Sequence, residues 1–494
     1  MHVTRQISRR SMLKAAGAAT AAVGVTGVTA GVTTVPAAAA GSGFAHPGLL
    51  HTRTDLERMA AKVKAGAAPY TTGFAKLTAN RHAQNGWRAN PQATVYRGAG
   101  SPQNYTILYN DIHAAYQNAL RYHVDGDSAH ADTAVAILNA WSAQLTSIEG
   151  SADRFLAAGL YGYQFANAAE LVRDRPGFDL AGAKKVLLDV FHPLSESFLA
   201  KHNGAYDTNY WPNWDLTALA CVLAVGIFCD DRAKVDRAVE YFKHGVGMGS
   251  VKNAIPVVYD DGLAEWVEAG RDQGHALLGV GLMGTVCEMA WNQGIDLYGY
   301  DDNRFLKGAQ YVAKWSMGGT VPYTANTRRK GAPGVWSGSE TASAAAAVDP
   351  AMTRPIWAMI ANHYTKRRGL SASYVTRIAA KAAPEGGGGD YGPNSGGFDQ
   401  LGFGTLAFTR DRVRAASARP SESAADAGAG ARPQSAATPS AATPSAVASA
   451  GSGDDLAATG STGLVGWTAA AGVTAVAGGL LLLRRRGRER REAE

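Results

Sequence analysis

Ionisable and amide side chains gather in one short run of the chain, Glu268-Ala-Gly-Arg271-Asp272-Gln273-Gly-His275, which precedes an apolar stretch that reaches residue 291. If the run is helical, Glu268, Arg271 and His275 fall at i, i+3 and i+7 and share one face. An imidazole on such a face can move a proton at the wall of a catalytic cleft. The alternative is a buried ion-pair network that joins helices.

Aromatic and amide side chains form a second candidate group, Tyr210-Trp211-Pro-Asn213-Trp214. Asn213 either caps a helix that starts at Trp214 or presents its amide to an anionic ligand. The three aromatic residues either pack in the core or offer flat apolar faces to sugar rings. Both groups point to a site for a polar, ring-shaped substrate.

Helices must position these groups, because the apolar period is helical over most of 44–411. We expect helices over 110–122, 128–145, 153–172, 181–199, 215–228, 231–242, 275–291 and 303–315. Short links between them predict antiparallel helix pairs, and Asp231 is the expected N-cap after one such link. A single bundle core stops growing near ~250 to 300 residues, so the fold class is all-α with an (α/α) toroid architecture. The alternating stretch 401–408 predicts a short strand that closes the domain.

The N-terminal segment 1–40 resembles a twin-arginine signal peptide. Ser8-Arg9-Arg10-Ser-Met-Leu-Lys14 is followed by an apolar run and by three alanines at 38–40, which are typical of a cleavage site. This resemblance implies export through the twin-arginine translocase.

The C-terminal segments resemble a sortase cell-wall sorting signal. A linker rich in Ala, Ser and Pro over 412–455 leads to the motif Leu-Ala-Ala-Thr459-Gly460 at 456–460. An apolar segment over 464–483 is long enough to span a bilayer, and the tail 484–494 is basic. The resemblance implies that sortase cleaves between Thr459 and Gly460 and links the chain to peptidoglycan, so that the membrane is contacted only before sorting. We therefore expect an exported protein that is covalently anchored to the cell wall.

The formal charge of +7 comes from these end segments. The remaining chain is close to neutral, which argues against nucleic acid as a partner. The three cysteines, Cys221, Cys229 and Cys287, form an odd set without CxxC spacing, so we expect core residues and neither a disulfide framework nor a metal site.

Several longer runs resemble the alginate lyase domain superfamily of bacterial polysaccharide lyases. They are Ala136 to Trp141, Leu160 to Glu170, Tyr210 to Leu216 and Glu268 to Tyr298. The resemblance implies an incomplete (α/α) toroid, β-elimination on a uronic-acid-containing polymer, alginate-like or glucuronan-like, and no metal or organic cofactor. Mannuronate lyases of the superfamily carry Asn-Asn-His just before the helix that begins here near Trp211. This chain has Asp207-Thr-Asn209 there, which leaves the base and the polymer open.

β-Elimination requires neutralisation of the C6 carboxylate, a base for the C5 proton and an acid for the departing oxygen. Asn213 and Arg271 suit the carboxylate, and His275 suits the base or a second neutralising role. Tyr210 is the nearest candidate for the acid. The residues expected to bind substrate are Trp211, Trp214, Gln273, Glu268, Tyr163 and Tyr161.

Two other classes of function fit the same features. A glycoside hydrolase can occupy the same architecture, and a non-catalytic cell-wall carbohydrate-binding protein would use the same aromatic residues. The product separates the enzymes, because only a lyase leaves a 4,5-unsaturated sugar that absorbs in the near ultraviolet.

Overall fold

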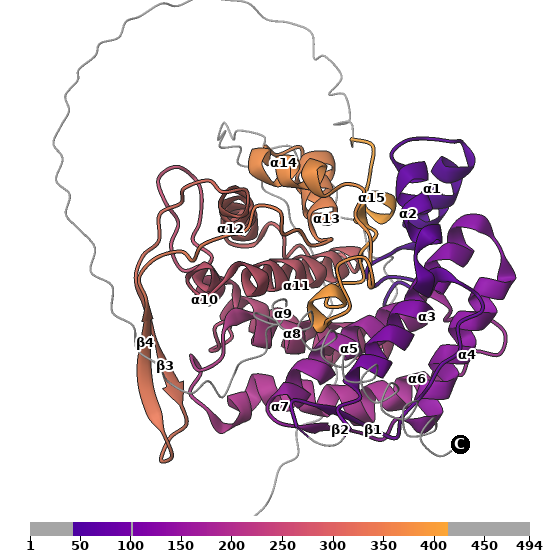
Figure 1. The fold of residues 1–494 in the computed structure, drawn as a ribbon, viewed down its shortest axis with the longest axis horizontal. Helices are drawn as coiled ribbons and strands as arrows, with labels where there is room; N and C mark the ends of the chain where they lie inside the picture. The colour runs from indigo at the N-terminus through magenta and orange to yellow at the C-terminus, as the bar shows by residue number, and fades with distance from the viewer. Residues whose placement is uncertain (1–42, 100–101, 413–494) are drawn as a thin grey trace, which may run out of the picture.

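The computed structural model describes residues 43–99 and 102–412. Its α-helices are α1 Arg53–Lys64, α2 Tyr70–Ala79, α3 Tyr105–Asp125, α4 Ser128–Gln144, α5 Asp153–Leu171, α6 Leu180–Val186, α7 His192–Lys201, α8 Pro212–Phe228, α9 Arg232–His244, α10 Val251–Ala254, α11 Gln273–Asn292, α12 Tyr300–Ser316, α13 Trp357–Asn362, α14 Ser373–Ala382 and α15 Gly404–Ala407. The helices follow one another around an arc, from α1–α4 on one side to α11–α14 on the other (Figure 1). The expected all-α fold is therefore confirmed.

Short irregular helices and two small sheets complete the described residues. The 3-10 segments are η1 Arg81–Ala83, η3 His202–Gly204, η4 Val267–Gly270 and η6 Ser395–Gly397, and the π-helical segments are η2 Leu187–Phe191 and η5 His363–Arg367. Strand β1 (Thr94–Arg97) pairs in parallel with β2 (Ser147–Gly150), and β3 (Asn326–Gly331) forms an antiparallel hairpin with β4 (Ser337–Ala342).

Each helix expected from the apolar period is present. The segment expected at 181–199 is interrupted by η2 between α6 and α7, and α9 begins after Asp231, whose side chain accepts from the Lys234 backbone N–H at 3.2 Å. The strand expected over 401–408 is wrong. Gly402 (φ +80°) and Phe403 (φ +57°) turn the backbone into the left-handed region, and α15 follows. Its alternating apolar residues are buried on all sides instead of forming one face of a sheet.

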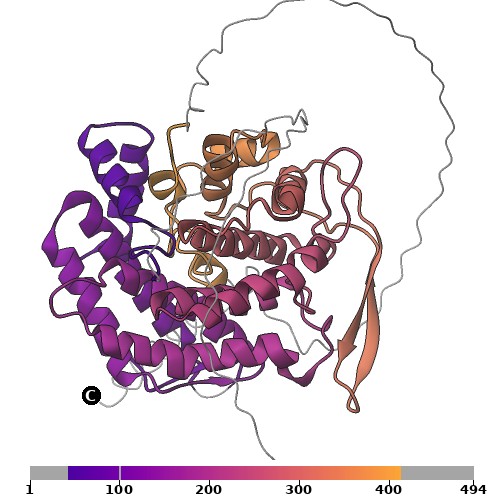
Figure 2. The same ribbon diagram turned by 180° about the vertical axis from the view of Figure 1, so that it is seen from behind.

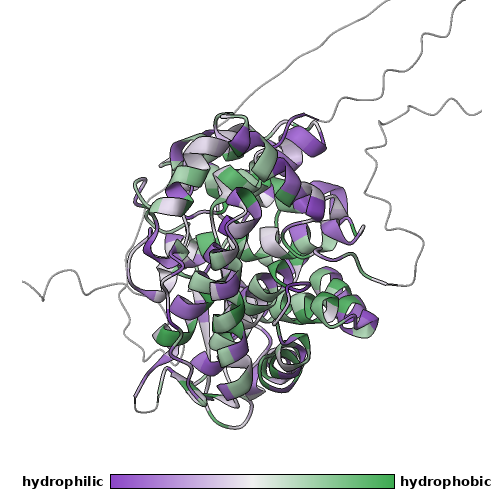
Figure 3. Cartoon of the chain, turned by 90° about the vertical axis from the view of Figure 1, so that its right-hand side faces the viewer, coloured by the Kyte–Doolittle hydropathy of each residue, from purple (hydrophilic) through white to green (hydrophobic). Residues whose placement is uncertain are grey.

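Helix α8 forms the centre of the core, and all of its residues are buried. Two glycines of α5 allow the two helices to approach closely. A Cβ on Gly159 would lie 2.7 Å from the Thr217 carbonyl carbon, and one on Gly162 would lie 2.5 Å from the Cys221 sulfur. Cys221 and Cys287 are buried and Cys229 is half-buried, and all three are free thiols, as expected. Figure 3 shows hydrophilic and hydrophobic residues alternating along many of the other helices.

The chain that follows α14 returns to the middle of the arc. The Phe398 carbonyl accepts a hydrogen bond from Gln164 Nε2 at 2.7 Å, and the Asp399 carbonyl accepts one from the Tyr163 hydroxyl at 2.5 Å. Both donors belong to α5. This return brings Asp399 and the N-terminus of α8 to the wall of one cavity.

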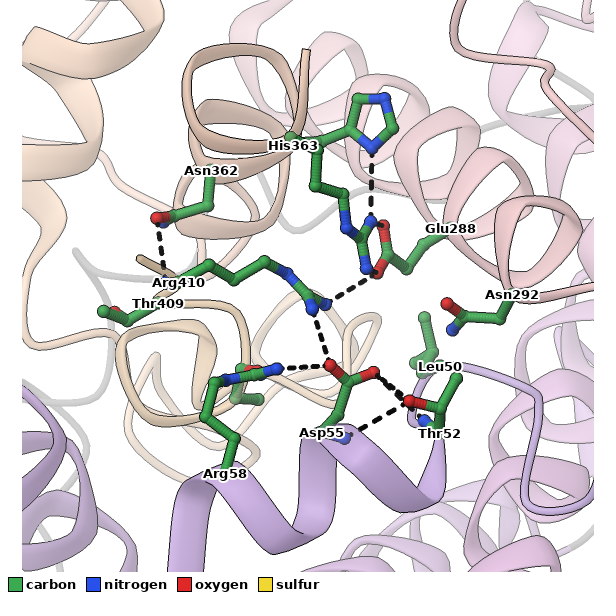
Figure 4. A network of polar contacts seen from close by, with 12 residues as sticks. Leu50, Thr52, Asp55, Arg58, Glu288, Asn292, Asn362, His363, Thr409 and Arg410 are labelled. Carbon is green, nitrogen blue, oxygen red and sulfur yellow. Dashed lines mark hydrogen bonds and ion pairs between the residues drawn. The ribbon is translucent and has the colours of Figure 1, made fainter. Parts of the chain in front are cut away.

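A buried charge network joins the two ends of the described chain (Figure 4). Arg410 pairs with Asp55 of α1 at 2.6 Å and with Glu288 of α11 at 3.3 Å, while Arg58 pairs with Asp55 at 2.5 Å. Arg367 of η5 holds both oxygens of Glu288, at 2.8 and 2.9 Å. Because charges are costly to bury unpaired, this network fixes α1 against the later helices.

The expected signal peptide, the linker, Thr459, Gly460 and the apolar segment 464–483 lie outside the described residues. Within residues 43–99 and 102–412, no helix is long and apolar enough to cross a bilayer.

Candidate active site

The run from Glu268 to His275 does not form a single helix. Residues Val267–Gly270 form η4, and Asp272 adopts an extended conformation (φ −168°) before α11 begins at Gln273. Asp272 is the N-cap of α11, and its Oδ1 accepts from the His275 backbone N–H at 2.8 Å. The turn nevertheless brings the expected side chains together. Arg271 lies 3.3 Å from Glu268 Oε1 and 3.2 Å from His275 Nε2.

The contacts of His275 define its tautomer. Asp272 Oδ2 lies 2.7 Å from Nδ1, and Arg271 Nη2 lies 3.2 Å from Nε2. A carboxylate only accepts and a guanidinium only donates, so Nδ1 carries the proton and Nε2 presents its lone pair. Burial alone would raise the pKa of Asp272, but the hydrogen bonds from His275, together with the charge of Arg271, lower it to about 2. Asp272 is therefore ionised and holds the imidazole in the form that can accept a proton.

Glu268 is buried and bonds to Asn213 instead of facing the solvent. Its carboxylate accepts a hydrogen bond from the Asn213 side-chain amide and one from the Asn213 backbone N–H at 3.3 Å. Burial raises the pKa of Glu268, against the lowering effect of Arg271 and His275. The structure encloses this side chain, and its expected contact with substrate stays a prediction. Glu268 orients Asn213 and Arg271.

Asn213 is not the cap of α8. Trp211 occupies the N-cap position without a side-chain hydrogen bond, and Asn213 lies in the first turn, where its side chain reaches across to Glu268. The capping alternative is therefore wrong. Asn213 lines a cavity, and the buried Glu268 carboxylate holds its side-chain amide in one orientation.

A cavity of about 330 Å³ opens between α5, α8, α11 and the returning C-terminal segment. Its lining residues include Asn213, Asp272, Gln273, His275, Leu278, Leu156, Leu160, Ala347, Asp349, Met352, Asp399, Arg97 and Arg354. Gln273 uses its amide to hold the wall, with bonds of 3.1 Å to the Asp349 carbonyl and 2.8 Å from the Asp349 N–H. Two of the four residues expected to be catalytic, Asn213 and His275, thus line one cavity with Arg271 beside them.

Two arginines of the cavity were not expected from the sequence. Arg97, at the end of β1, is only 6% exposed, and its Nη1 donates to the Tyr161 hydroxyl at 3.0 Å. Burial lowers the pKa of Arg97, but Tyr161, Asp399 and Asp153 outweigh this effect and raise it. Within the described residues no carboxylate forms an ion pair with Arg97. Arg354, by contrast, pairs with Asp399 at 2.9 Å and donates to the Gly396 carbonyl at 2.8 Å.

Arg97 is therefore a buried cation with unused donors at the wall of the cavity. The rings of Tyr105 and Tyr161 lie 5.1 and 5.8 Å from its guanidinium carbon and hold it from the sides. A single arginine in a short strand has no sequence signal that separates it from a surface arginine. Its position could not have been inferred from spacing.

The expected aromatic residues lie outside the cavity. Tyr210 and Trp214 pack against each other at 4.5 Å, and Phe198 lies 5.0 and 5.7 Å from them. Trp211 is also buried, beneath Arg328, whose guanidinium carbon is 4.6 Å from the ring. The structure places Trp211, Trp214 and Tyr210 in the core, and their expected roles in stacking on sugar rings and as the acid stay predictions.

Tyr161 and Tyr163 are also buried, and neither lines the cavity directly. The Tyr161 hydroxyl accepts from Arg97, and the Tyr163 hydroxyl donates to the Asp399 carbonyl. Both hydroxyls bond to cavity residues, and the expected role of these tyrosines in substrate binding stays a prediction. Among the residues that the structure describes, no group of three or more His, Cys, Asp or Glu side chains is arranged to hold a metal ion.

The family model described as alginate lyase matches residues 59–320, which is more than half of the 494 residues. The chain belongs to this family and is a polysaccharide lyase. The match includes Asn213, Glu268, Arg271 and His275. It ends before the cavity-lining residues from Ala347 to Asp399. Family membership selects the lyase over the glycoside hydrolase and the non-catalytic carbohydrate-binding protein. No protein of curated function matches the chain.

Solved structures similar to this chain include two alginate lyases. An alginate lyase from Bacteroides ovatus has 14% identity and a TM-score of 0.41, covering 55% of this chain and 83% of its own. Alginate lyase A1-III from Sphingomonas species A1 has 15% identity and a TM-score of 0.44, covering 72% of this chain and 95% of its own. A single-residue variant of A1-III without ligand gives 14% identity and a TM-score of 0.47, covering 73% and 95%. Because these TM-scores are below 0.5, the family assignment depends on the family model alone.

Proposed function

We propose that this lyase cleaves an alginate-like polymer of uronic acids by β-elimination in the cavity between α5, α8 and α11. The observation that carries the proposal is an imidazole at the cavity wall, held by Asp272 through Nδ1 so that Nε2 is the acceptor, together with the buried cation Arg97 at the same wall. The His275 imidazole can act as the base, and the Arg97 guanidinium can bind the carboxylate of a uronic acid.

In the proposed reaction, His275 Nε2 takes the C5 proton. The electrons of the C5–H bond form the C4–C5 double bond, the C4–O4 bond breaks, and the departing oxygen takes the proton from the imidazolium. The charge that develops on the C6 carboxylate is stabilised by Arg97, Asn213 and Arg271. Because Arg271 donates to Nε2, the substrate carboxylate must draw Arg271 away before the base can act.

One aspartate of the cavity, Asp272, supports elimination over hydrolysis. Asp272 is bonded to His275, and Asp399 is paired with Arg354. A glycosidase needs one carboxyl group that remains protonated as a general acid. The pKa of Asp272 is lowered to about 2, so this carboxyl group does not suit that role.

The test is a panel of purified uronate polymers, including alginate and glucuronan, with absorbance of unsaturated ends as the readout. We expect turnover of alginate, and the absence of absorbing products on every polymer would refute the proposal. Arg97→Met provides the residue test. Because methionine removes the donor to the buried Tyr161 hydroxyl, we expect Arg97→Met to lose about 1 to 3 kcal/mol of stability and to remain folded. We expect KM to rise by roughly tenfold to a hundredfold, as loss of a charge-assisted bidentate contact predicts.

We also propose that the chain is exported by the twin-arginine translocase and anchored to peptidoglycan by sortase. The motifs around Arg9 and Arg10 and at Leu456 to Gly460 support this localisation. Thr459→Ala should prevent wall linkage and leave the chain in the membrane fraction. Equal amounts of wall-linked protein from the variant and the parent would refute the anchoring, and export of an Arg9→Lys and Arg10→Lys double variant at the parent level would refute the route.

A further inference from the structure

One part of the cavity wall takes no part in the proposed elimination. It comes from segments 347–354 and 395–399, which lie beyond the residues that match the family model. Figures 1 and 2 show from both sides that the chain after α14 returns to the middle of the arc. The base and the groups that bind the C6 carboxylate come instead from β1, α8, α11 and the turn before α11. This second part of the wall is therefore available for another role.

Arg354 and Asp399 form an ion pair in this part of the wall. Nη1 of Arg354 donates to Asp399 Oδ2 at 2.9 Å and to the Gly396 carbonyl at 2.8 Å. The Asp399 backbone is held separately, because its carbonyl accepts from the Tyr163 hydroxyl. The two side chains are 13% and 7% exposed, so the pair is largely shielded from solvent. These contacts tie the two segments together with one guanidinium nitrogen and one carboxylate oxygen.

The other terminal atoms of the pair, Arg354 Nη2 and Asp399 Oδ1, make no hydrogen bond within residues 43–99 and 102–412. Neither atom is fully buried, and both residues line the cavity. Gly396 leaves room beside the guanidinium, since a Cβ there would lie 3.2 Å from Nη2. A guanidinium only donates and a carboxylate accepts at both oxygens. The pair therefore presents one donor and one acceptor to a ligand in the cavity.

Two neighbouring hydroxyl groups of a sugar match this donor and this acceptor. One hydroxyl donates to Asp399 Oδ1, and the other accepts from Arg354 Nη2. In a polyuronate that is cleaved at the C4–O4 bond, the hydroxyls on C2 and C3 are adjacent and are not part of the linkage. A second carboxylate suits this place less well, because Asp399 and the exposed Asp349 lie at the same part of the wall and would repel it.

We propose that Asp399 and Arg354 are specificity-determining residues, which bind the C2 and C3 hydroxyl groups of one sugar in the cavity. The substrate is then a polyuronate whose hydroxyls are unmodified, and a polymer that is O-acetylated at these positions is a poor substrate. An acetyl ester removes the proton that Asp399 accepts and adds bulk beside Gly396, but it leaves the C6 carboxylate unchanged. This inference rests on the proposed function, because it takes a polyuronate to be the substrate of the cavity.

The test compares one uronate polymer before and after chemical O-acetylation. Acetylation should raise KM of the parent by roughly tenfold to a hundredfold, as loss of a hydrogen bond to a charged group predicts. Asp399→Asn keeps an oxygen towards Arg354 but places an amide donor at Oδ1. It should raise KM for the unmodified polymer and bring the ratio of the two KM values close to one. Arg354→Lys keeps a cation beside Asp399 but removes Nη2, and it should lower the same ratio.

This ratio separates recognition from folding, because KM does not depend on the fraction of enzyme that is folded. Asp296→Asn is the matched control. Asp296 also pairs with an arginine, Arg368, but it lies between α11 and α12 and does not line the cavity. This variant should keep both KM values of the parent.

Equal KM values of the parent for the two polymers would overturn the proposal and leave the proposed function standing. The parent ratio in both Asp399→Asn and Arg354→Lys would overturn it too, since another group would then read the hydroxyls. If the parent cleaves neither polymer, the proposed function fails, and affinity electrophoresis through gels that contain each polymer decides on the pair. Retardation that is lost on acetylation and in Asp399→Asn supports the pair, and equal retardation in all cases overturns it.

Discussion

Replacement of Asp272 by asparagine separates the catalytic and structural roles of the turn before α11. Asp272 uses Oδ1 to cap the helix at the His275 N–H, 2.8 Å away, and Oδ2 to hold His275 Nδ1 at 2.7 Å. Asparagine is as good an N-cap as aspartate, so Asp272→Asn keeps the first contact. The amide that replaces Oδ2 donates instead of accepting, and it therefore favours the tautomer with its proton on Nε2.

The expected loss follows from that tautomer. A proton on Nε2 removes the lone pair that must accept the C5 proton and places an N–H against Arg271, 3.2 Å away. General base catalysis contributes about 10² to 10⁴ in rate, and we expect Asp272→Asn to lose this factor in kcat. Asp272→Ala should lose the same factor and, in addition, about 0.5 to 2 kcal/mol of stability from the missing cap.

The measurements are initial rates from the absorbance of unsaturated ends and Tm for the parent and both variants. Asp272→Asn should have the Tm of the parent within about 1 °C, and Asp272→Ala a Tm about 1 to 3 °C lower. An asparagine variant with at least a tenth of the parent kcat would refute the assignment of His275 as the base. If kcat falls in proportion to Tm in both Asp272→Asn and Asp272→Ala, the turn has a structural role.

Three further predictions concern buried polar groups. Asn213→Ala should lower stability by about 1 to 3 kcal/mol as well as activity, because Glu268 loses its donor; an unchanged denaturation midpoint would contradict the contact. Burial raises the pKa of Glu385 to about 7, so the folded carboxyl stays protonated while the unfolded one ionises above its ordinary value of 4.5. The parent should therefore lose stability as pH rises from 4.5 to 7, and Glu385→Gln should not, so that a constant Tm difference across this window would disprove the shift. Burial raises the pKa of Asp55, but the charges of Arg410 and Arg58 outweigh burial and lower this pKa below its ordinary value of 3.8. The contribution of Asp55 to the free energy of unfolding is therefore present above pH 3.8 and is lost as the pH falls further. Asp55→Asn should cost about 3 to 5 kcal/mol at pH 7 and about 1 kcal/mol less than that at pH 3, as measured by chemical unfolding at both pH values.

The sequence alone predicted the helices and the chemical types in the site, because both depend on local order. The apolar period of 3.6 residues identified α3 to α9, α11 and α12 to within a few residues. The run 268–275 contains the imidazole, its carboxylate and its guanidinium within eight residues, so any compact turn brings them together. The N-cap at Asp231 was also predictable from its own neighbours.

Tertiary structure decided which residues surround the cavity and which are buried behind it. Arg97 lies more than 250 residues before Arg354 and Asp399, and no spacing rule relates the three. Tyr210 and Trp214 are of the aromatic types that stack on sugar rings, but they pack against Phe198 and are buried. Local order fixes which side chains are neighbours along the chain. The exposure of a side chain depends on long-range packing, which the local pattern does not contain.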